Sequence, residues 1–97
     1  MPRELLVEGP DGPLKPVPLI GSRLSVGRSS AVELSFPEDA GLSRQHFAFE
    51  AQGDDWTIQD LGSKNGTYVN NARIEQSQLK HKDVVVMGGS RLAVNLG

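Results

Sequence analysis

Glycine and proline divide this chain into short segments, and the apolar runs between them are only a few residues long. The 97 residues include 11 Gly and 6 Pro. Glycine tolerates the positive φ values of tight turns, and proline lacks the amide donor that helix interiors and central strands require. Such frequent interruption favours many short strands joined by turns over long helices. The sequence therefore predicts an all-β fold.

Within these segments apolar and polar residues alternate, which is typical of strands with one buried face. Phe47 and Phe49, and then Trp56 and Ile58, are expected to point into the core. The predicted strands cover residues 4–8, 15–20, 23–27, 32–36, 46–51, 56–61, 67–69, 73–74, 84–87 and 91–96. Turn-forming residues at 9–13 fold strand 15–20 back on the first strand, and its prolines restrict it to a sheet edge. About ten short strands at close spacing predict a sandwich or barrel.

Size and composition limit the classes of function. A chain of 97 residues is expected to form a single domain, residues 1–97, and its 37% hydrophobic and 23% charged residues suit a globular fold. A net charge of −2 provides no positive excess for binding nucleic acid. The chain has no Cys and only His46 and His81, so we expect no disulfide, metal site or cofactor. Without any apolar run near the ~18–20 residues of a membrane span, we expect no membrane insertion and a cytoplasmic location.

Three loop segments carry the side chains with recognisable chemistry: residues 27–28, 43–46 and 62–67. A phosphate dianion requires charge-assisted donors, and Arg28, Ser43 and Arg44 supply two guanidinium groups and a hydroxyl. The amide of Asn65 has both donors and an acceptor, which suits a contact with the main chain of an extended peptide. Because loops at one end of a sandwich converge, we expect phosphate and peptide to be recognised together.

The same segments contain a fingerprint that resembles the forkhead-associated (FHA) family. In order they read Gly27-Arg28, Ser43-Arg44-Gln45-His46 and Asn65-Gly66-Thr67-Tyr68-Val69-Asn70. The resemblance extends over essentially the whole chain. It implies a sandwich of about eleven short, mostly antiparallel strands that binds a phosphothreonine-containing protein and catalyses no reaction. Such a domain is expected to be one module of a larger protein and to bind a substrate of a Ser/Thr kinase.

The resemblance also implies roles for individual residues. Arg28 and Ser43 would contact phosphate, Arg44 would add a second cation, and Asn65 would hold the peptide main chain. The family prefers phosphothreonine because the extra methyl group enters a small apolar recess, a discrimination of ~1–3 kcal/mol. The residues expected to support the site are Gly27, His46, Lys64, Gly66, Thr67 and Asn70.

Two positions depart from the pattern of the family. Lys64 stands where some members have a hydroxyl residue, and Glu33 stands where Asp or Asn is frequent. The change at Lys64 bears on which residues are preferred beside the phosphothreonine.

The same residues allow other interpretations. Ser43 and His46 resemble a nucleophile and its base, but the sequence marks neither an orienting acid nor an oxyanion hole, which argues against an enzyme. Alternation from Phe47 instead places His46 at the mouth of a strand, where its ring is expected to hold neighbouring loop main chain. The second functional hypothesis is a phosphate-independent protein–protein or oligomerisation domain that uses an outer sheet face. The presence of Arg28, Ser43 and Asn65 together favours the phosphothreonine receptor.

Overall fold

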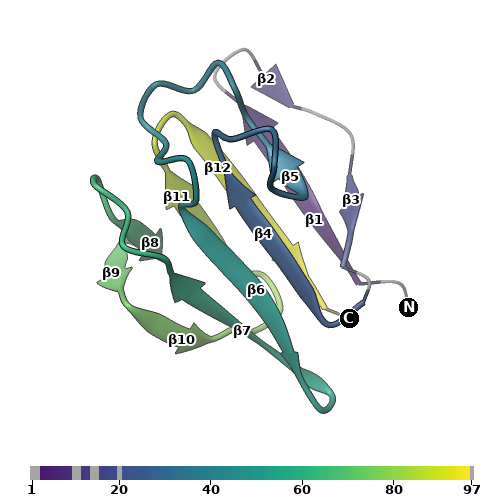
Figure 1. Cartoon of the computed structure of the whole chain (residues 1–97). Helices are drawn as coiled ribbons and strands as arrows, with labels where there is room; N and C mark the ends of the chain where they lie inside the picture. The colour runs from purple at the N-terminus through teal and green to yellow at the C-terminus, as the bar shows by residue number, and fades with distance from the viewer. Residues whose placement is uncertain (1–2, 10–11, 14–15, 20, 97) are drawn as a thin grey trace.

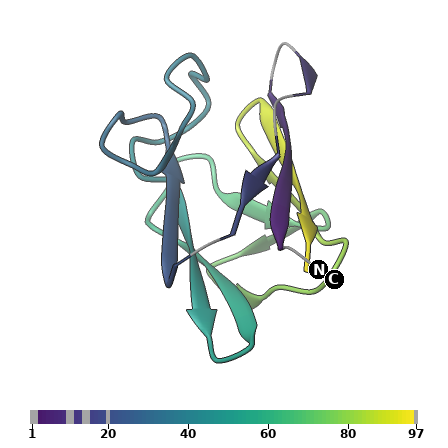
Figure 2. The same ribbon diagram turned by 90° about the vertical axis from the view of Figure 1, so that its right-hand side faces the viewer.

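The computed structural model describes residues 3–9, 12–13, 16–19 and 21–96, and these form two β-sheets packed face to face (Figures 1 and 2). The larger sheet contains β1 (Glu4–Gly9), β2 (Gly12–Pro13), β3 (Val17–Pro18), β8 (Thr67–Val69), β9 (Ala72–Ile74), β11 (Val84–Met87) and β12 (Ser90–Asn95). The smaller sheet contains β4 (Arg23–Gly27), β5 (Leu34–Ser35), β6 (Phe47–Gln52), β7 (Asp55–Asp60) and β10 (Gln76–Gln78). These twelve strands of the described ranges confirm the predicted all-β sandwich.

The strand order is β2-β1-β12-β11-β8-β9 in the larger sheet, with β3 also paired to β1, and β10-β7-β6-β4-β5 in the smaller. All pairs are antiparallel except β4 with β5. Among the described segments none is a helix of the length and apolarity that a bilayer crossing requires.

The core lies between the two sheets, where alternate residues of facing strands meet. Phe47, Phe49 and Ile58 of the smaller sheet are fully buried, as are Leu5 and Leu92 of the larger sheet. The two phenylalanine rings meet edge to face at 5.1 Å between centroids. Burying each such side chain contributes about 1.5–3 kcal/mol, so the two inward-facing phenylalanines predicted for 46–51 each stabilise the fold.

The proline-rich return segment forms a sheet edge, as predicted, but in two short pieces. β2 pairs with the end of β1 through Glu8 and Pro13, and β3 pairs with its start through Leu5 and Val17. The predicted strand 15–20 is therefore shorter, and residues 14, 15 and 20 lie outside the described residues. The predicted turn 9–13 is corrected at its end, because Gly12–Pro13 pairs with β1, and its residues 10 and 11 lie outside the described residues.

One further predicted strand differs from the structure by more than one residue at an end, and one observed strand was not predicted. The predicted strand 32–36 is reduced to Leu34–Ser35, which pairs in parallel with the end of β4. The strand Gln76–Gln78 was missed, because it has no apolar residue to reveal an alternation. It forms because the free edge of β7 offers unpaired main-chain groups, so that Ser77 lies opposite Ile58.

The loops next to β4, β6 and β7 lie at the same end of the sandwich. His46 N–H donates to the Val26 carbonyl at 2.9 Å, and Leu61 N–H donates to the His46 carbonyl at 2.9 Å. These bonds continue the β4–β6 and β6–β7 ladders to the last residue before each loop. The loops that follow β4, precede β6 and follow β7 therefore start side by side.

Candidate functional site

Hydrogen bonds join the three loop segments that were singled out in the sequence. Arg28 N–H donates to the Ser43 carbonyl at 3.0 Å, and Ser29 N–H donates to the Arg44 carbonyl at 3.1 Å. The main-chain N–H of Lys64 donates to Ser43 Oγ at 2.9 Å. Residues 28, 43 and 64 are thus neighbours in space although they are distant in the sequence.

Gly27 allows the closest of these approaches. A Cβ atom at this position would lie 2.1 Å from the Arg44 carbonyl oxygen and 3.0 Å from that of Ser43. Any larger residue would push strand β4 away from the main chain of residues 43–44. The glycine therefore places Arg28 directly beside Ser43 and Arg44.

Three exposed cations surround this junction: Arg28, Arg44 and Lys64. Arg28 Nε donates to the Leu42 carbonyl at 3.2 Å, which holds the guanidinium group near the loop. In the described part of the chain the ion pair found is Arg91 with Glu8, on another face. The positive charge of the loops is thus without a paired carboxylate among the described residues.

A shallow hollow of about 380 Å³ lies beside the two arginines. It is lined by Arg28, Ser29, Ser30, Pro37 and Arg44. Guanidinium groups and hydroxyls around an open hollow are suited to a small, highly charged anionic group.

Ser43 is half-buried and uses its hydroxyl oxygen as an acceptor for the Lys64 N–H. Its own main-chain N–H donates to His46 Nδ1 at 3.1 Å. A serine hydroxyl has one hydrogen to donate in addition to its lone pairs. The Ser43 hydroxyl hydrogen is therefore available to a ligand.

His46 is fully buried and links two of the loops through both ring nitrogens. Nδ1 accepts from Ser43 N–H, so the proton of the neutral ring is on Nε2, which donates to the Gly66 carbonyl at 2.8 Å. The ring therefore holds loop main chain in the way expected from the sequence, while its effect on binding stays a prediction. It makes no hydrogen bond to Ser43 Oγ, so the nucleophile–base arrangement is not formed.

Asn65 is exposed at the edge of the same cluster. Its Nδ2 donates to the Gly41 carbonyl at 2.9 Å, which orients the amide and directs its other groups away from that bond. The next residue, Gly66, has a φ of 89°, and a Cβ there would lie 2.8 Å from Arg73 Nε. The positive φ requires glycine after the asparagine, whereas the flexible end of the Arg73 side chain can shift away from a Cβ atom.

Asp60 organises the loop that carries Lys64 and Asn65, a role that was not predicted from the sequence. Its carboxylate accepts from the N–H groups of Gly62 and Ser63, from the Ser63 hydroxyl and from Thr67 Oγ1, the last at 2.7 Å. Partial burial raises the pKa of Asp60, but the hydrogen bonds from Ser63 and Thr67 outweigh it and hold the pKa below its ordinary value. An Asp two residues before a Gly is a signal for such a turn.

Two residues discussed from the sequence make their hydrogen bonds outside the loop junction. Asn70 donates to Asp83 Oδ1 at 2.9 Å and accepts from Val84 N–H at 3.0 Å, so it fixes the β8–β9 turn against the start of β11. Glu33 accepts from the main chain and hydroxyl of Ser25, and that hydroxyl bond lowers the pKa of Glu33. The described residues contain no group of three His, Asp or Glu side chains arranged as metal ligands.

Comparison with known proteins identifies relatives of this arrangement. The family model for the FHA domain matches residues 24–88, which include all three loop segments. The chain is 37% identical over 71 residues to the FHA domain-containing protein FhaA of Mycobacterium tuberculosis, covering 73% of this chain and 13% of that protein. It is 36% identical over 73 residues to the glycogen accumulation regulator GarA of Mycolicibacterium smegmatis, covering 75% of this chain and 46% of that protein. The chain thus spans less than half of either relative.

Solved structures agree over nearly the full length. A crystal structure of the FhaA FHA domain in complex with the intracellular domain of another protein superposes with a TM-score of 0.85 at 31% identity, covering 96% of this chain and 99% of that one. A structure from a study of phosphothreonine-dependent FHA domain interactions gives a TM-score of 0.86 at 30% identity, with 98% and 96% coverage. The chain belongs to the FHA domain family.

Proposed function

We propose that the junction of the three loops binds a phosphothreonine-containing segment of a partner protein. The observation that carries this proposal is the group of Arg28, Ser43 and Arg44, joined by hydrogen bonds and without a paired carboxylate among the described residues. A phosphate dianion supplies the missing negative charge and accepts from both guanidinium groups and from the free hydroxyl hydrogen of Ser43.

Asn65 extends the contact from phosphate to peptide. One of its amide hydrogens is committed to Gly41, and its remaining donor and its acceptor suit the main chain of an extended segment. The loop around this asparagine is held by three bonds, from Thr67 Oγ1 to Asp60, from Lys64 N–H to Ser43 Oγ and from Gly66 N–H to Ser63 Oγ. The structural relative studied for phosphothreonine-dependent interactions supports threonine as the phosphorylated residue.

The domain acts in this proposal as a non-catalytic adaptor within a longer protein. Both nitrogens of His46 are engaged in holding loops, which leaves no base beside Ser43. The relative GarA is named a regulator, which agrees with recruitment rather than catalysis. The partner would be a Ser/Thr kinase substrate in the cytoplasm.

The experiment is a titration of the wild-type protein and two arginine variants with phosphothreonine peptides selected from an oriented library. Arg28→Ala removes a charge-assisted contact of about 1.5–3 kcal/mol, so the affinity should fall by about tenfold to more than a hundredfold. Arg23→Ala is the matched control, because Arg23 is an exposed arginine at the opposite end of the same strand β4. Equal affinities of the wild type and Arg28→Ala would refute the assignment.

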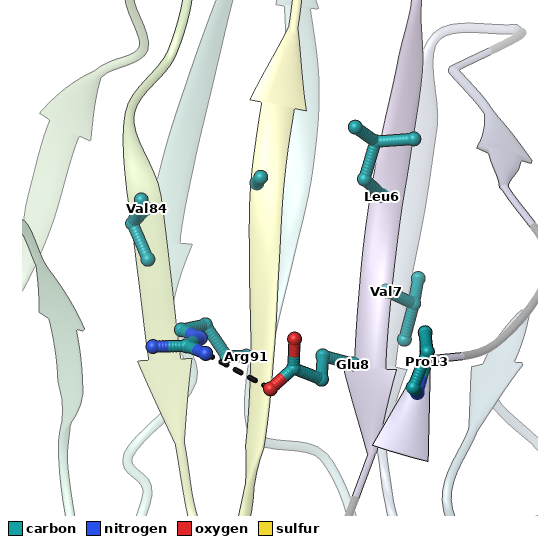
Figure 3. A pocket seen from close by; sticks show the side chains of 7 residues that line it. Leu6, Val7, Glu8, Pro13, Val84 and Arg91 are labelled. Atoms are coloured by element: carbon teal, nitrogen blue, oxygen red, sulfur yellow. Dashed lines mark hydrogen bonds and ion pairs between the residues drawn. The ribbon is translucent and has the colours of Figure 1, made fainter.

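A phosphate-independent contact through the outer face of the larger sheet is the second candidate. Leu6 is 47% exposed there and lies in a row with Ala93 and Val84, beside the Glu8–Arg91 ion pair (Figure 3). These side chains line a hollow of about 430 Å³. Sedimentation of the wild type and Leu6→Ser tests self-association through this face. If the face mediates self-association, the wild type should form a concentration-dependent dimer and the variant should remain a monomer.

A further inference from the structure

The buried carboxylate of Asp39 connects the loop before β6 to the turn between β11 and β12. Its side chain is 5% exposed. Oδ1 accepts from the N–H groups of Gly41 and Gly89, both at 3.1 Å, and Oδ2 accepts from Gly89 N–H at 2.9 Å and from Ser90 Oγ at 2.8 Å. Within the described residues no cation pairs with this carboxylate. Burying an ionised group is costly unless donors surround it, so these bonds hold Asp39 firmly between the two segments.

The two segments also touch through their main chains. A Cβ at Gly41 would lie 2.8 Å from the Gly88 Cα, and a Cβ at Gly88 would lie 2.8 Å from Asp39 Oδ1. Gly88 in addition has a φ of 51°. The main chain of Gly41 therefore lies directly against Gly88, beside the Asp39 carboxylate.

The carbonyl that Asn65 binds belongs to this same segment. Asp39 binds the N–H of Gly41, and the carbonyl of Gly41 accepts the Asn65 amide at 2.9 Å. A continuous path of hydrogen bonds thus runs from Ser90 through Asp39 and Gly41 to Asn65. No other side-chain hydrogen bond of Asn65 is present within the described residues.

We propose that Asp39 is a positioning residue of the binding site, which sets the orientation of the Asn65 amide by holding residues 39–41 on the turn 88–90. Asp39 itself does not touch the ligand. The effect on affinity rests on the proposed function, because it requires that Asn65 grips the peptide. The effect on the Asn65 amide does not, since it exists in the free protein.

The test uses Asp39→Asn, which keeps the shape of the side chain but replaces one acceptor oxygen with a donor that faces other donors. The side-chain amide resonances of Asn65 in the free protein should move, and peptide affinity should fall roughly tenfold, equivalent to about 1.4 kcal/mol. Asp54→Asn is the matched control, because Asp54 is an exposed aspartate in the β6–β7 turn at the far end of the sandwich. It should change neither quantity.

A double-mutant cycle with Asn65→Ala separates positioning from general loss of stability. In the Asn65→Ala background, Asp39→Asn should cause no further loss of affinity at a temperature where both variants are folded. If Asp39→Asn fails to fold, Ser90→Ala removes a single donor from Asp39 Oδ2 and should give the same pattern with a smaller amplitude.

Three results would overturn the proposal. The Asn65 amide resonances could remain in place in the variant, the affinity could be unchanged although Asn65→Ala weakens binding, or the two substitutions could act additively. If the wild type binds no phosphopeptide, the proposed function fails, while the resonances of Asn65 still decide whether Asp39 positions its amide.

Discussion

Replacing His46 with alanine tests whether this ring supports the site or contacts the ligand. The substitution removes a fully buried side chain and both of its hydrogen bonds, at 3.1 Å to Ser43 N–H and at 2.8 Å to the Gly66 carbonyl. It also removes the edge contact with Phe47, at 6.1 Å between ring centroids. Two unsatisfied groups and a cavity give an expected loss of roughly 2–4 kcal/mol in the free energy of unfolding. For a domain of this size that corresponds to a fall in Tm of roughly 10–25 °C.

The assay is a thermal melt followed by the fluorescence of Trp56, which is 3% exposed, paired with a phosphopeptide titration at a temperature where the variant is folded. Binding should weaken as well, because both loops lose their common anchor. His81→Ala is the control, since His81 is an exposed histidine and its loss should alter Tm by only a few degrees. A His46→Ala protein with unaltered melting and no binding would make His46 a direct ligand contact and refute the division of roles.

Three further outcomes are expected. Gly27→Ala should lower the free energy of unfolding by about 1–3 kcal/mol in a denaturant titration, because the new Cβ would lie 2.1 Å from the Arg44 carbonyl oxygen and the main chain must shift. Unchanged stability would contradict that contact. The pKa of Asp60 is lower in the folded state than its ordinary value of 3.8, so the ionised carboxylate stabilises the fold fully above pH 3.8 and loses this effect as the pH falls through the folded pKa. The difference in Tm between wild type and Asp60→Asn should therefore shrink only below about pH 4. Phosphopeptide affinity should weaken between pH 7.5 and 5 as the phosphate, with a second pKa of about 6, becomes a monoanion, and a flat profile would argue against a dianion contact.

Much of the fold could be predicted because alternation marks any strand with one buried face. The bounds of β4, β8 and β11 agree with the prediction. The edge position of β3 was predicted from its prolines, which lack an amide donor. The strand β10 could not be found in this way, since its three residues carry no apolar side chain and it is held by the edge of β7. The parallel pairing of β5 with β4 likewise depends on the path of the loop that connects them, and local alternation does not predict that path.

The loop junction could be predicted to the extent that its residues stand next to one another in the chain. Arg28, Ser43 and Asn65 fall in compact segments, and the structure brings those segments together. Asp39 was missed because its donors in the turn 88–90 lie 50 residues or more away, a separation at which sequence spacing has no meaning. Asn70 belongs to the same fingerprint, but its amide oxygen accepts from Val84 N–H at the start of β11 and makes no bond to the loops within the described residues.

Two opposing effects decide how replacement of Arg28 with alanine changes stability. Removing an exposed residue from a cationic cluster relieves repulsion between like charges, which by itself leaves Tm unchanged or slightly higher. The bond from its Nε to the Leu42 carbonyl opposes that relief of repulsion, by about 0.5–1.5 kcal/mol for a typical hydrogen bond. We therefore expect a change in Tm of only a few degrees for Arg28→Ala, far smaller than that for His46→Ala.

If phosphate provides the binding energy, two peptides that differ only in that group should differ strongly in affinity. Isothermal titration of the wild-type domain with a library-selected phosphothreonine peptide and its unphosphorylated twin should give saturable binding for the first. For the second the affinity should be more than about a hundredfold weaker, because several charge-assisted contacts are lost together. Equal affinity for the two peptides would contradict phosphate recognition and favour a phosphate-independent contact through the outer face around Leu6 and Arg91 (Figure 3).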